Sequence, residues 1–274
     1  MPLLIPITDP ADPRIEAYRD IRERDLVGRE RMFVAEGKVV VEKLVEASLH
    51  RPASLLIADK RVAGLTAMLG RVGDDVPVYV AAQAVIDAVA GFPLHRGILA
   101  IGRRMDDAGA DALLASLGEG AATVLLLSGI ANHDNMGGIL RNAAAFGVHA
   151  VLLDADCCDP LYRKAIRVSV GAALLVPMTR LARGDDPVAL LGRHGFAGVA
   201  LSPEGTTLLH EWRPGQRNAV VLGAEGPGLA PTLIARMRSL RIEMASGFDS
   251  LNVATTSGIV LHHIAAAGIS RSSA

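Results

Sequence analysis

Short runs of consecutive apolar residues in the C-terminal half of the chain limit its fold more than any other feature. Six of them are expected to be buried strands: TVLLLSGI (123–130), HAVLLD (149–154), ALLVPM (173–178), FAGVALS (196–202), NAVVLG (218–223) and LRIEM (240–244). Segments with helical patterns separate them, and the last of these segments, residues 250–269, is long and apolar. Continuous rather than alternating runs are typical of a mostly parallel sheet with helices on both faces. The pattern therefore predicts an α/β fold.

The N-terminal part shows a similar alternation on a smaller scale. Strands are predicted at FVAEG (33–37), SLLIAD (54–59), VPVYVA (76–81) and RGILAIGR (96–103), with helices at 38–49, 61–70 and 81–91. Residues 14–27 have the pattern of an exposed, charged helix. After the last of these strands, residues 105–121 are acidic and rich in glycine and alanine. We therefore predict a small α/β domain at 1–105, a linker at 106–121 that holds one short helix, and a larger α/β domain at 122–274.

The charge balance limits how the protein can bind nucleic acid. The 274 residues include 28 basic and 29 acidic side chains, which gives a net charge of −1. Any binding of nucleic acid must therefore come from local basic surface. Arginine supplies 24 of the 28 basic residues. That excess fits phosphate partners, since guanidinium groups bind phosphate bidentately, but a genome with high GC content would also produce it.

Cysteine usage and the N-terminus indicate a reducing, cytoplasmic setting. The only cysteines, Cys157 and Cys158, are adjacent, which is poor geometry for a disulfide bond. The N-terminus has no signal-peptide pattern, and no apolar stretch is long enough for a membrane span. We expect neither a membrane segment nor a metal site, because no CxxC or HExxH spacing occurs.

The first of three polar loops, SGIANHDNMGGILRNAAAFG (128–147), follows a predicted strand. Asn135 is expected to cap the helix that follows, and Gly147 to end it. Arg141 lies one turn after Gly137, so its side chain is expected near the same end of the helix. This loop suits an anionic or ribose-phosphate ligand, although an ordinary turn with a surface arginine is an equally good interpretation.

The second loop lies in VVLGAEGPGLAPTLIARM (220–237), where Gly223, Gly226 and Gly228 surround Glu225. It is neither the GxGxxG dinucleotide motif nor a P-loop. Glycines this close together indicate tight turns and a close backbone approach to another group. We favour a functional role over a plain turn.

The third loop, within LRIEMASGFDSLNVATTSGIVLHH (240–263), opens the long C-terminal helix. Ser250 is a candidate for its N-terminal cap. The early helical positions Asn252, Thr255, Thr256 and Ser257 are small or polar, which would also suit close packing against another segment. A nucleophile-elbow hydrolase has no support, because no GxSxG motif occurs.

Taken in order, the three loops resemble the motifs of the SpoU branch of the SPOUT RNA methyltransferases. NMGGILRNA (135–143) is similar to motif one, VVLGAEGPGL (220–229) to motif two, and IEMASGFDSLNVATTSG (242–258) to motif three. RKAIRVSVGAALLVP (163–177) also resembles the family segment between motifs one and two. The resemblance is close over about residues 120–270. It is looser in the N-terminal domain, where FVAEGKVVVEKLV (33–45) is similar to the family's small substrate-binding domain.

The resemblance implies a C-terminal α/β domain with a trefoil knot, S-adenosylmethionine as cofactor, and a homodimer without a metal. The implied reaction is methylation of a ribose 2′-hydroxyl in structured rRNA or tRNA, with the N-terminal domain binding the RNA. The implied catalytic residues are Asn135, Arg141, Glu225, Ser250 and Asn252. The implied cofactor-binding residues are Leu201, Gly223, Gly226, Ile242, Met244 and Leu251.

Two alternatives and one departure accompany the resemblance. A knotted RNA-binding protein without activity is the main alternative, and a nucleotide-dependent oxidoreductase would need the dinucleotide motif that is missing. Glu243 stands where the family usually has proline in motif three. It would cost several kcal/mol if buried unpaired against the cofactor, and nothing if exposed.

Overall fold

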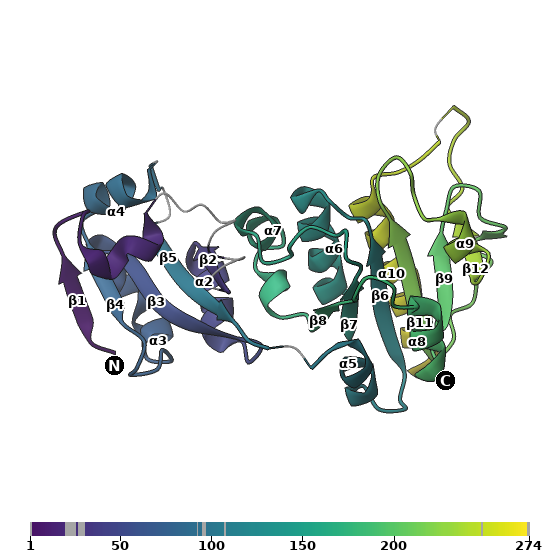
Figure 1. The fold of residues 1–274 in the computed structure, drawn as a ribbon, viewed down its shortest axis with the longest axis horizontal. Coiled ribbons are helices and arrows are strands. Elements are labelled where there is room, and N and C mark those ends of the chain that lie inside the picture. Colours follow the sequence, from purple (N-terminus) through teal and green to yellow (C-terminus); the bar gives the residue numbers. More distant parts are fainter. Residues whose placement is uncertain are drawn as a thin grey trace. The chain divides into compact units, whose positions relative to one another are not determined.

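A computed structural model describes residues 2–19, 26, 31–91, 93–94, 97–106, 108–247 and 249–272. The chain divides into two compact units (Figure 1). The first unit holds residues 1–106 and 160–175, and the second holds residues 107–159 and 176–274. The crossover segment 160–175 contains α7 (Arg163–Val168) and the 3-10 helix η3 (Ala172–Leu174).

The second unit is built on a seven-stranded sheet in the order β10-β12-β9-β11-β6-β7-β8. All its strand pairs are parallel. The strands are β6 (Ala122–Ser128), β7 (Ala150–Leu153), β8 (Met178–Arg180), β9 (Ala197–Leu201), β10 (Thr207–Leu208), β11 (Arg217–Gly223) and β12 (Arg238–Arg241). The predicted α/β class with a mostly parallel sheet is confirmed.

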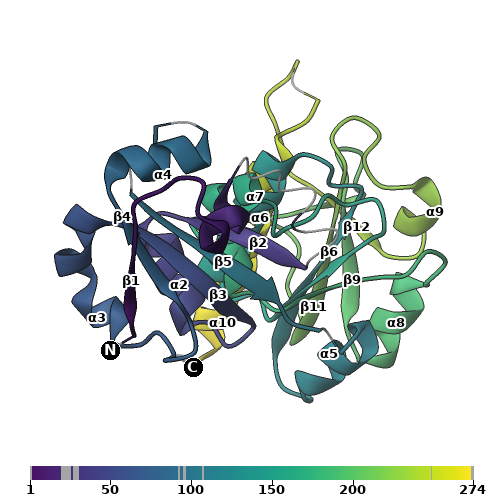
Figure 2. The same cartoon turned by 60° about the vertical axis from the view of Figure 1, so that its left-hand side comes forward.

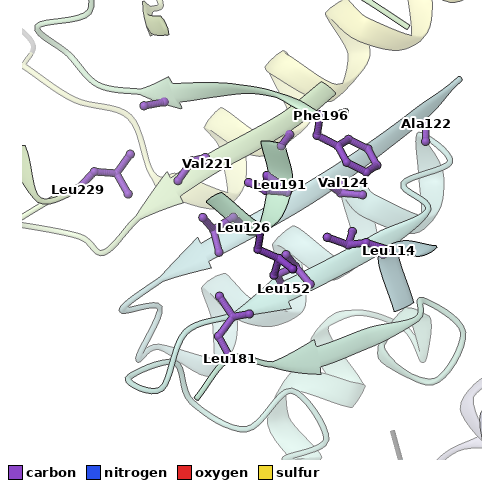
Figure 3. Close-up of a cluster of buried hydrophobic side chains, with 14 residues drawn as sticks. Leu114, Ala122, Val124, Leu126, Leu152, Leu181, Leu191, Phe196, Val221 and Leu229 are labelled. Carbon is purple, nitrogen blue, oxygen red and sulfur yellow. The ribbon is translucent and has the colours of Figure 1, made fainter. Parts of the chain in front are cut away.

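Helices cover both faces of this sheet, because its strands carry apolar side chains on both faces. The helices of the unit are α5 (Ala110–Ser116), α6 (His133–Ala145), α8 (Pro187–Arg193), α9 (Pro231–Ile234) and α10 (Val253–Ser272). On one face, Leu114 of α5 and Leu191 of α8 pack with Leu126, Leu152 and Val221 of the strands (Figure 3). Residues with the opposite parity, such as Leu125 and Val220, are also fully buried, as expected for a sheet sandwiched between helices.

The first unit contains a five-stranded mixed sheet in the order β1-β4-β3-β5-β2 (Figure 2). Its strands are β1 (Leu4–Ile7), β2 (Met32–Glu36), β3 (His50–Ala58), β4 (Val78–Ala81) and β5 (Ile98–Arg104). Its helices are η1 (Pro13–Tyr18), α2 (Lys38–Glu46), η2 (Asp59–Leu65), α3 (Thr66–Leu69) and α4 (Gln83–Ala90). Residues from η1, α4 and all five strands form a hydrophobic core of its own.

Several sequence predictions were wrong in detail. The N-terminal sheet has five strands rather than four, because β1 is short and joins the edge of the sheet beside β4. Residues 173–178 are not one strand: residues 172–174 form η3, and β8 begins only at Met178. The break follows Val170 and Gly171, whose φ values of 53° and 78° do not fit an extended chain. In place of a helix over 14–27, residues 13–18 form η1 with Ile15 and Tyr18 buried, and most of the remainder lies outside the described residues.

Candidate functional site

A cavity of about 480 Å³ lies at the carboxyl ends of β9, β11 and β12, next to the start of α10. Ligands of open parallel sheets bind at this end of the strands. All six predicted cofactor-binding residues line it: Leu201, Gly223, Gly226, Ile242, Met244 and Leu251. Glu225, Ser250 and Asn252 line it as well.

The glycine-rich turn after β11 shapes one wall of the cavity. A Cβ atom on Gly223 would lie 2.5 Å from the carbonyl carbon of Gly228, so only glycine fits without a backbone shift. The turn is closed by a hydrogen bond from the Gly228 amide to the Ala224 carbonyl oxygen, and Gly226 has a φ of 88°. These constraints explain the glycine spacing, because a side chain at either position would distort the turn.

The Asn252 side chain connects the three motif loops. Its Nδ2 donates to Asn135 Oδ1 at 2.8 Å and to Glu225 Oε1 at 2.9 Å. Its Oδ1 accepts from the backbone amides of Ala254 and Thr255, which is the geometry of an N-terminal cap for α10. One amide group therefore both starts α10 and joins residues 117 positions apart in the chain.

Close packing of α6 against α10 holds this arrangement. A Cβ atom on Gly138 would lie 2.7 Å from the Cβ atom of Ala254, so the helices approach without a side chain between them. Asn142 Nδ2 donates to the Ala254 carbonyl oxygen at 2.7 Å and to Ser257 Oγ at 2.9 Å. Ser257 is fully buried. Of the residues predicted to favour close packing at the start of α10, Ser257 serves that purpose, whereas Thr255 is exposed and Asn252 and Thr256 line the cavity.

Two capping predictions need correction. Asn132, not Asn135, caps α6: its side chain accepts from the amides of Asp134 and Asn135. Asn135 lies within the first turn of α6 and is only 7% exposed. Its side chain faces Asn252, from which it accepts a hydrogen bond. Asn252 rather than Ser250 caps α10. Gly147, with a φ of 67°, follows the end of α6 as expected.

Arg141 lies on α6 but does not line the cavity. Its side chain is exposed, and among the described residues it has no hydrogen bond or ion pair. The structure therefore brings together four of the five predicted catalytic residues and leaves the Arg141 guanidinium open to solvent. Glu243 is exposed and is not a lining residue, so it carries no burial cost.

Sequence reasoning missed some residues of the site. Ser202 and Pro203, directly after β9, and Thr256 of α10 line the cavity. A usable signal was available for the first two, because they follow a predicted strand that ends at the same edge of the sheet as the three motif loops. The role of Asn142 had no such signal, since its partners lie more than a hundred residues away.

Asp154 organises the neighbouring carboxyl ends of β6 and β7. Partial burial opposes its ionisation, but hydrogen bonds from Ser128, Gly129, Asp156 and Cys157 hold its pKa below the ordinary value. Burial raises the pKa of the Cys157 thiol to about 12 and that of Cys158 to about 11. Both cysteines are free and, as protonated thiols, are poor nucleophiles and metal ligands.

Two further searches of the described residues found nothing. No cluster of three or more His, Cys, Asp and Glu side chains there could hold a metal ion. Nor does any helix in the described ranges combine the length and apolar character needed to cross a bilayer.

Known sequences similar to this chain share one family. The sequence profile of the SpoU rRNA Methylase family matches residues 122–262. An uncharacterized tRNA/rRNA methyltransferase of Mycobacterium bovis is 40% identical over 271 residues, covering 93% of this chain and 90% of the relative. RlmB of Escherichia coli, a 23S rRNA (guanosine-2′-O-)-methyltransferase, is 31% identical over 81% of this chain and 93% of its own.

Solved structures share the fold. An AdoMet-bound rRNA methyltransferase from Sinorhizobium meliloti superimposes with a TM-score of 0.80 at 22% identity, covering 95% of this chain and 97% of that one. The SpoU methyltransferase AviRb from Streptomyces viridochromogenes, in complex with AdoMet, gives a TM-score of 0.78 at 19% identity, covering 94% and 100%. At these identities, the likeness is one of fold.

Proposed function

Because the chain belongs to the SpoU rRNA methylase family, we propose that it methylates a ribose 2′-hydroxyl of rRNA or tRNA with S-adenosylmethionine. The observation that carries the proposal is that the second and third motif loops line one cavity and that Asn252 joins the first loop to them through hydrogen bonds to Asn135 and Glu225. The names of the relatives support RNA methylation, and the guanosine-2′-O designation of RlmB supports the 2′-hydroxyl as acceptor.

The cavity suits S-adenosylmethionine in size and chemistry. Its volume of about 480 Å³ falls in the range of about 300–1,000 Å³ found for small-molecule sites. Apolar side chains, Leu201, Ile242 and Leu251 among them, offer contacts for a purine ring. The glycine-rich turn lets backbone amides and carbonyls approach polar groups of a ligand. Leu201, Gly223, Gly226, Ile242, Met244 and Leu251 are the residues proposed to hold the cofactor.

When bound, S-adenosylmethionine supplies an electrophilic methyl group. The protein must hold the ribose oxygen in line with that methyl group and stabilise the negative charge that develops on the oxygen. Arg141 is assigned the second task, because it matches the arginine of motif one and its cationic side chain is exposed. It stabilises charge on the ribose oxygen and binds the adjacent phosphate. Asn135, Asn252 and Glu225 form the hydrogen-bonded set that orients the motif loops, and Ser250 contributes a hydroxyl at the rim.

The resemblance also supports five further features of the proposal. Residues 1–105 bind the RNA substrate and residues 122–274 form the methyltransferase domain; within the predicted linker 106–121, α5 packs against the sheet of the second unit. The trefoil knot is part of the proposal on the strength of the resemblance alone. The protein works as a homodimer and needs no metal. With rRNA or tRNA as its substrate, its proposed place is the cytoplasm.

No observation favours a catalytically silent RNA-binding protein, because the polar residues implied for the reaction are all present. The test is methyl transfer by the purified full chain from labelled S-adenosylmethionine to unmodified 23S rRNA, 16S rRNA and tRNA transcripts. Alkaline hydrolysis followed by mass spectrometry then locates the label. Label in alkali-resistant dinucleotides is expected, since 2′-O-methylation blocks hydrolysis of the adjacent bond. Label on a base, or none with any of the three RNAs, would overturn the proposal.

A further inference from the structure

β3 begins and β5 ends at the same end of the first unit's sheet (Figure 2), and two arginines pair there. Arg51 of β3 and Arg103 of β5 lie directly opposite each other in the antiparallel register, and both are exposed. Opposite residues share a face of the sheet with Cβ atoms about 4.5–5.5 Å apart, and like charges at that spacing destabilise the pair. The arrangement is therefore unfavourable unless an anion binds to it.

A β-bulge creates this pairing. Ser54 lies opposite Ile101, and continuing that register would place Pro52 opposite Arg103. The register shifts between Pro52 and Ser54, so that Arg51 takes the position opposite Arg103. Bulges often redirect side chains next to functional sites. Without the shift, Arg51 would have lain opposite Arg104; the shift places it opposite Arg103 and places His50 opposite Arg104.

Nearby carboxylates do not neutralise the two arginines. In the part of the chain that the structure describes, neither Arg51 nor Arg103 takes part in an ion pair or side-chain hydrogen bond. Asp106 is paired with Arg31, which precedes β2. The Arg31 carbonyl oxygen accepts from the amide of Arg104, so this residue also lies at the same end of the sheet. In the described part of the chain, Arg51 and Arg103 are therefore two exposed cations without an ion-pair partner on one face of this end of the sheet.

We propose that Arg51 and Arg103 form a surface that binds the phosphodiester backbone of the RNA substrate. The inference rests on the proposed function and assigns part of its RNA recognition to a defined end of one sheet. Guanidinium groups bind phosphate through two parallel hydrogen bonds. Because the whole chain has a net charge of −1, binding to RNA requires such a local concentration of positive charge.

The test compares the wild-type full chain with Arg51→Ala/Arg103→Ala. The matched control is Lys60→Ala/Arg61→Ala, which removes two exposed cations from η2, at the opposite end of β3. Binding of unmodified 23S rRNA transcript is measured from 50 to 300 mM salt. Each lost phosphate contact lowers the slope of log K against log salt by about 0.7–0.9. The arginine variant is therefore expected to lose about 1.5 from the slope and about tenfold or more in affinity at 0.1 M salt.

The salt dependence of RNA binding and the methylation of RNA decide the outcome, and two controls accompany them. In the arginine variant, S-adenosylmethionine affinity is expected to equal the wild-type value, and the melting temperature to equal or exceed it, since a repulsive pair is removed. If the wild type methylates the RNA but the arginine variant keeps the wild-type slope, or changes no more than the control, the phosphate-binding surface is refuted and the proposed function stands. If the wild type neither binds nor methylates any of the RNAs, both fail together.

Discussion

Replacing Asn252 tests the amide that connects the three motif loops. In Asn252→Ala, α10 loses its cap, which costs about 1 kcal/mol. Asn135 Oδ1, on a residue only 7% exposed, also loses its partner, which costs about 1–3 kcal/mol more. The hydrogen bond to Glu225 is exposed and adds little. We expect the free energy of unfolding to fall by about 2–4 kcal/mol and S-adenosylmethionine affinity to fall with it.

The assay is urea unfolding followed by tryptophan fluorescence. Trp212 is the only tryptophan in the chain and is 4% exposed in the second unit, so its signal reports on that unit. Cofactor binding is measured separately by calorimetry. Asn132→Ala is the matched control, because it removes the cap of α6 without touching the three-way contact. It should cost about 1 kcal/mol and leave cofactor affinity nearly unchanged.

Asn252→Asp separates the cap from the donor. A carboxylate still caps α10, but it faces Glu225 and offers Asn135 no hydrogen. The like charges raise the pKa of one carboxyl group in the folded state, so the penalty is present at neutral pH and disappears as pH falls through that pKa. If Asn252→Ala matches Asn132→Ala in both stability and cofactor affinity, the reasoning about this amide is refuted.

Three further predictions test other parts of the molecule. Arg141→Ala should lower single-turnover methyl transfer at least about a hundredfold, corresponding to about 2.7 kcal/mol, with cofactor affinity and melting temperature unchanged. Arg141→Lys should not restore the rate fully. Near-wild-type turnover in the Ala variant would remove Arg141 from the mechanism. Gly223→Ala should weaken S-adenosylmethionine binding at least about tenfold, since the new Cβ would meet the Gly228 backbone at 2.5 Å. The control Gly64→Ala, whose Cβ meets nothing within 4 Å, should have no effect in the same calorimetry. Equal affinities in both variants would contradict the role of the turn. Burial and the nearby Arg104 charge lower the pKa of His50 to about 4, against about 6.5 in an unfolded chain. The unfolded state therefore binds a proton on His50 more tightly than the folded state, and stability is lost as pH falls from about 6.5 to about 4. His50→Gln should show a smaller loss between pH 7 and pH 4 in urea unfolding followed by circular dichroism, and an identical loss would show that His50 does not contribute.

The sequence by itself determined most strands of the parallel sheet, the order of the three loops and the end of α6. These features depend on neighbours in the chain. A continuous apolar run such as 123–130 can be buried only as a central strand or a core helix, and flanking glycine and polar residues favour the strand. Gly147 ends α6 because it adopts a φ of 67° at no steric cost. The loops could be expected to meet, since parallel strands present their carboxyl ends at one edge of a sheet.

Tertiary structure alone decided which residue makes which contact. Asn135 could be expected as a cap from its place in the sequence, but Asn132 caps the helix and Asn135 faces Asn252, 117 positions away. The edge strands β1 and β10 are too short for a local pattern, and pairing with β4 and β12 is what makes them strands. The opposition of Arg51 and Arg103 depends on a register shift between two strands. Local periodicity records which residues are buried, but hydrogen bonds and registers between distant segments depend on how the whole chain packs, and no local pattern encodes them.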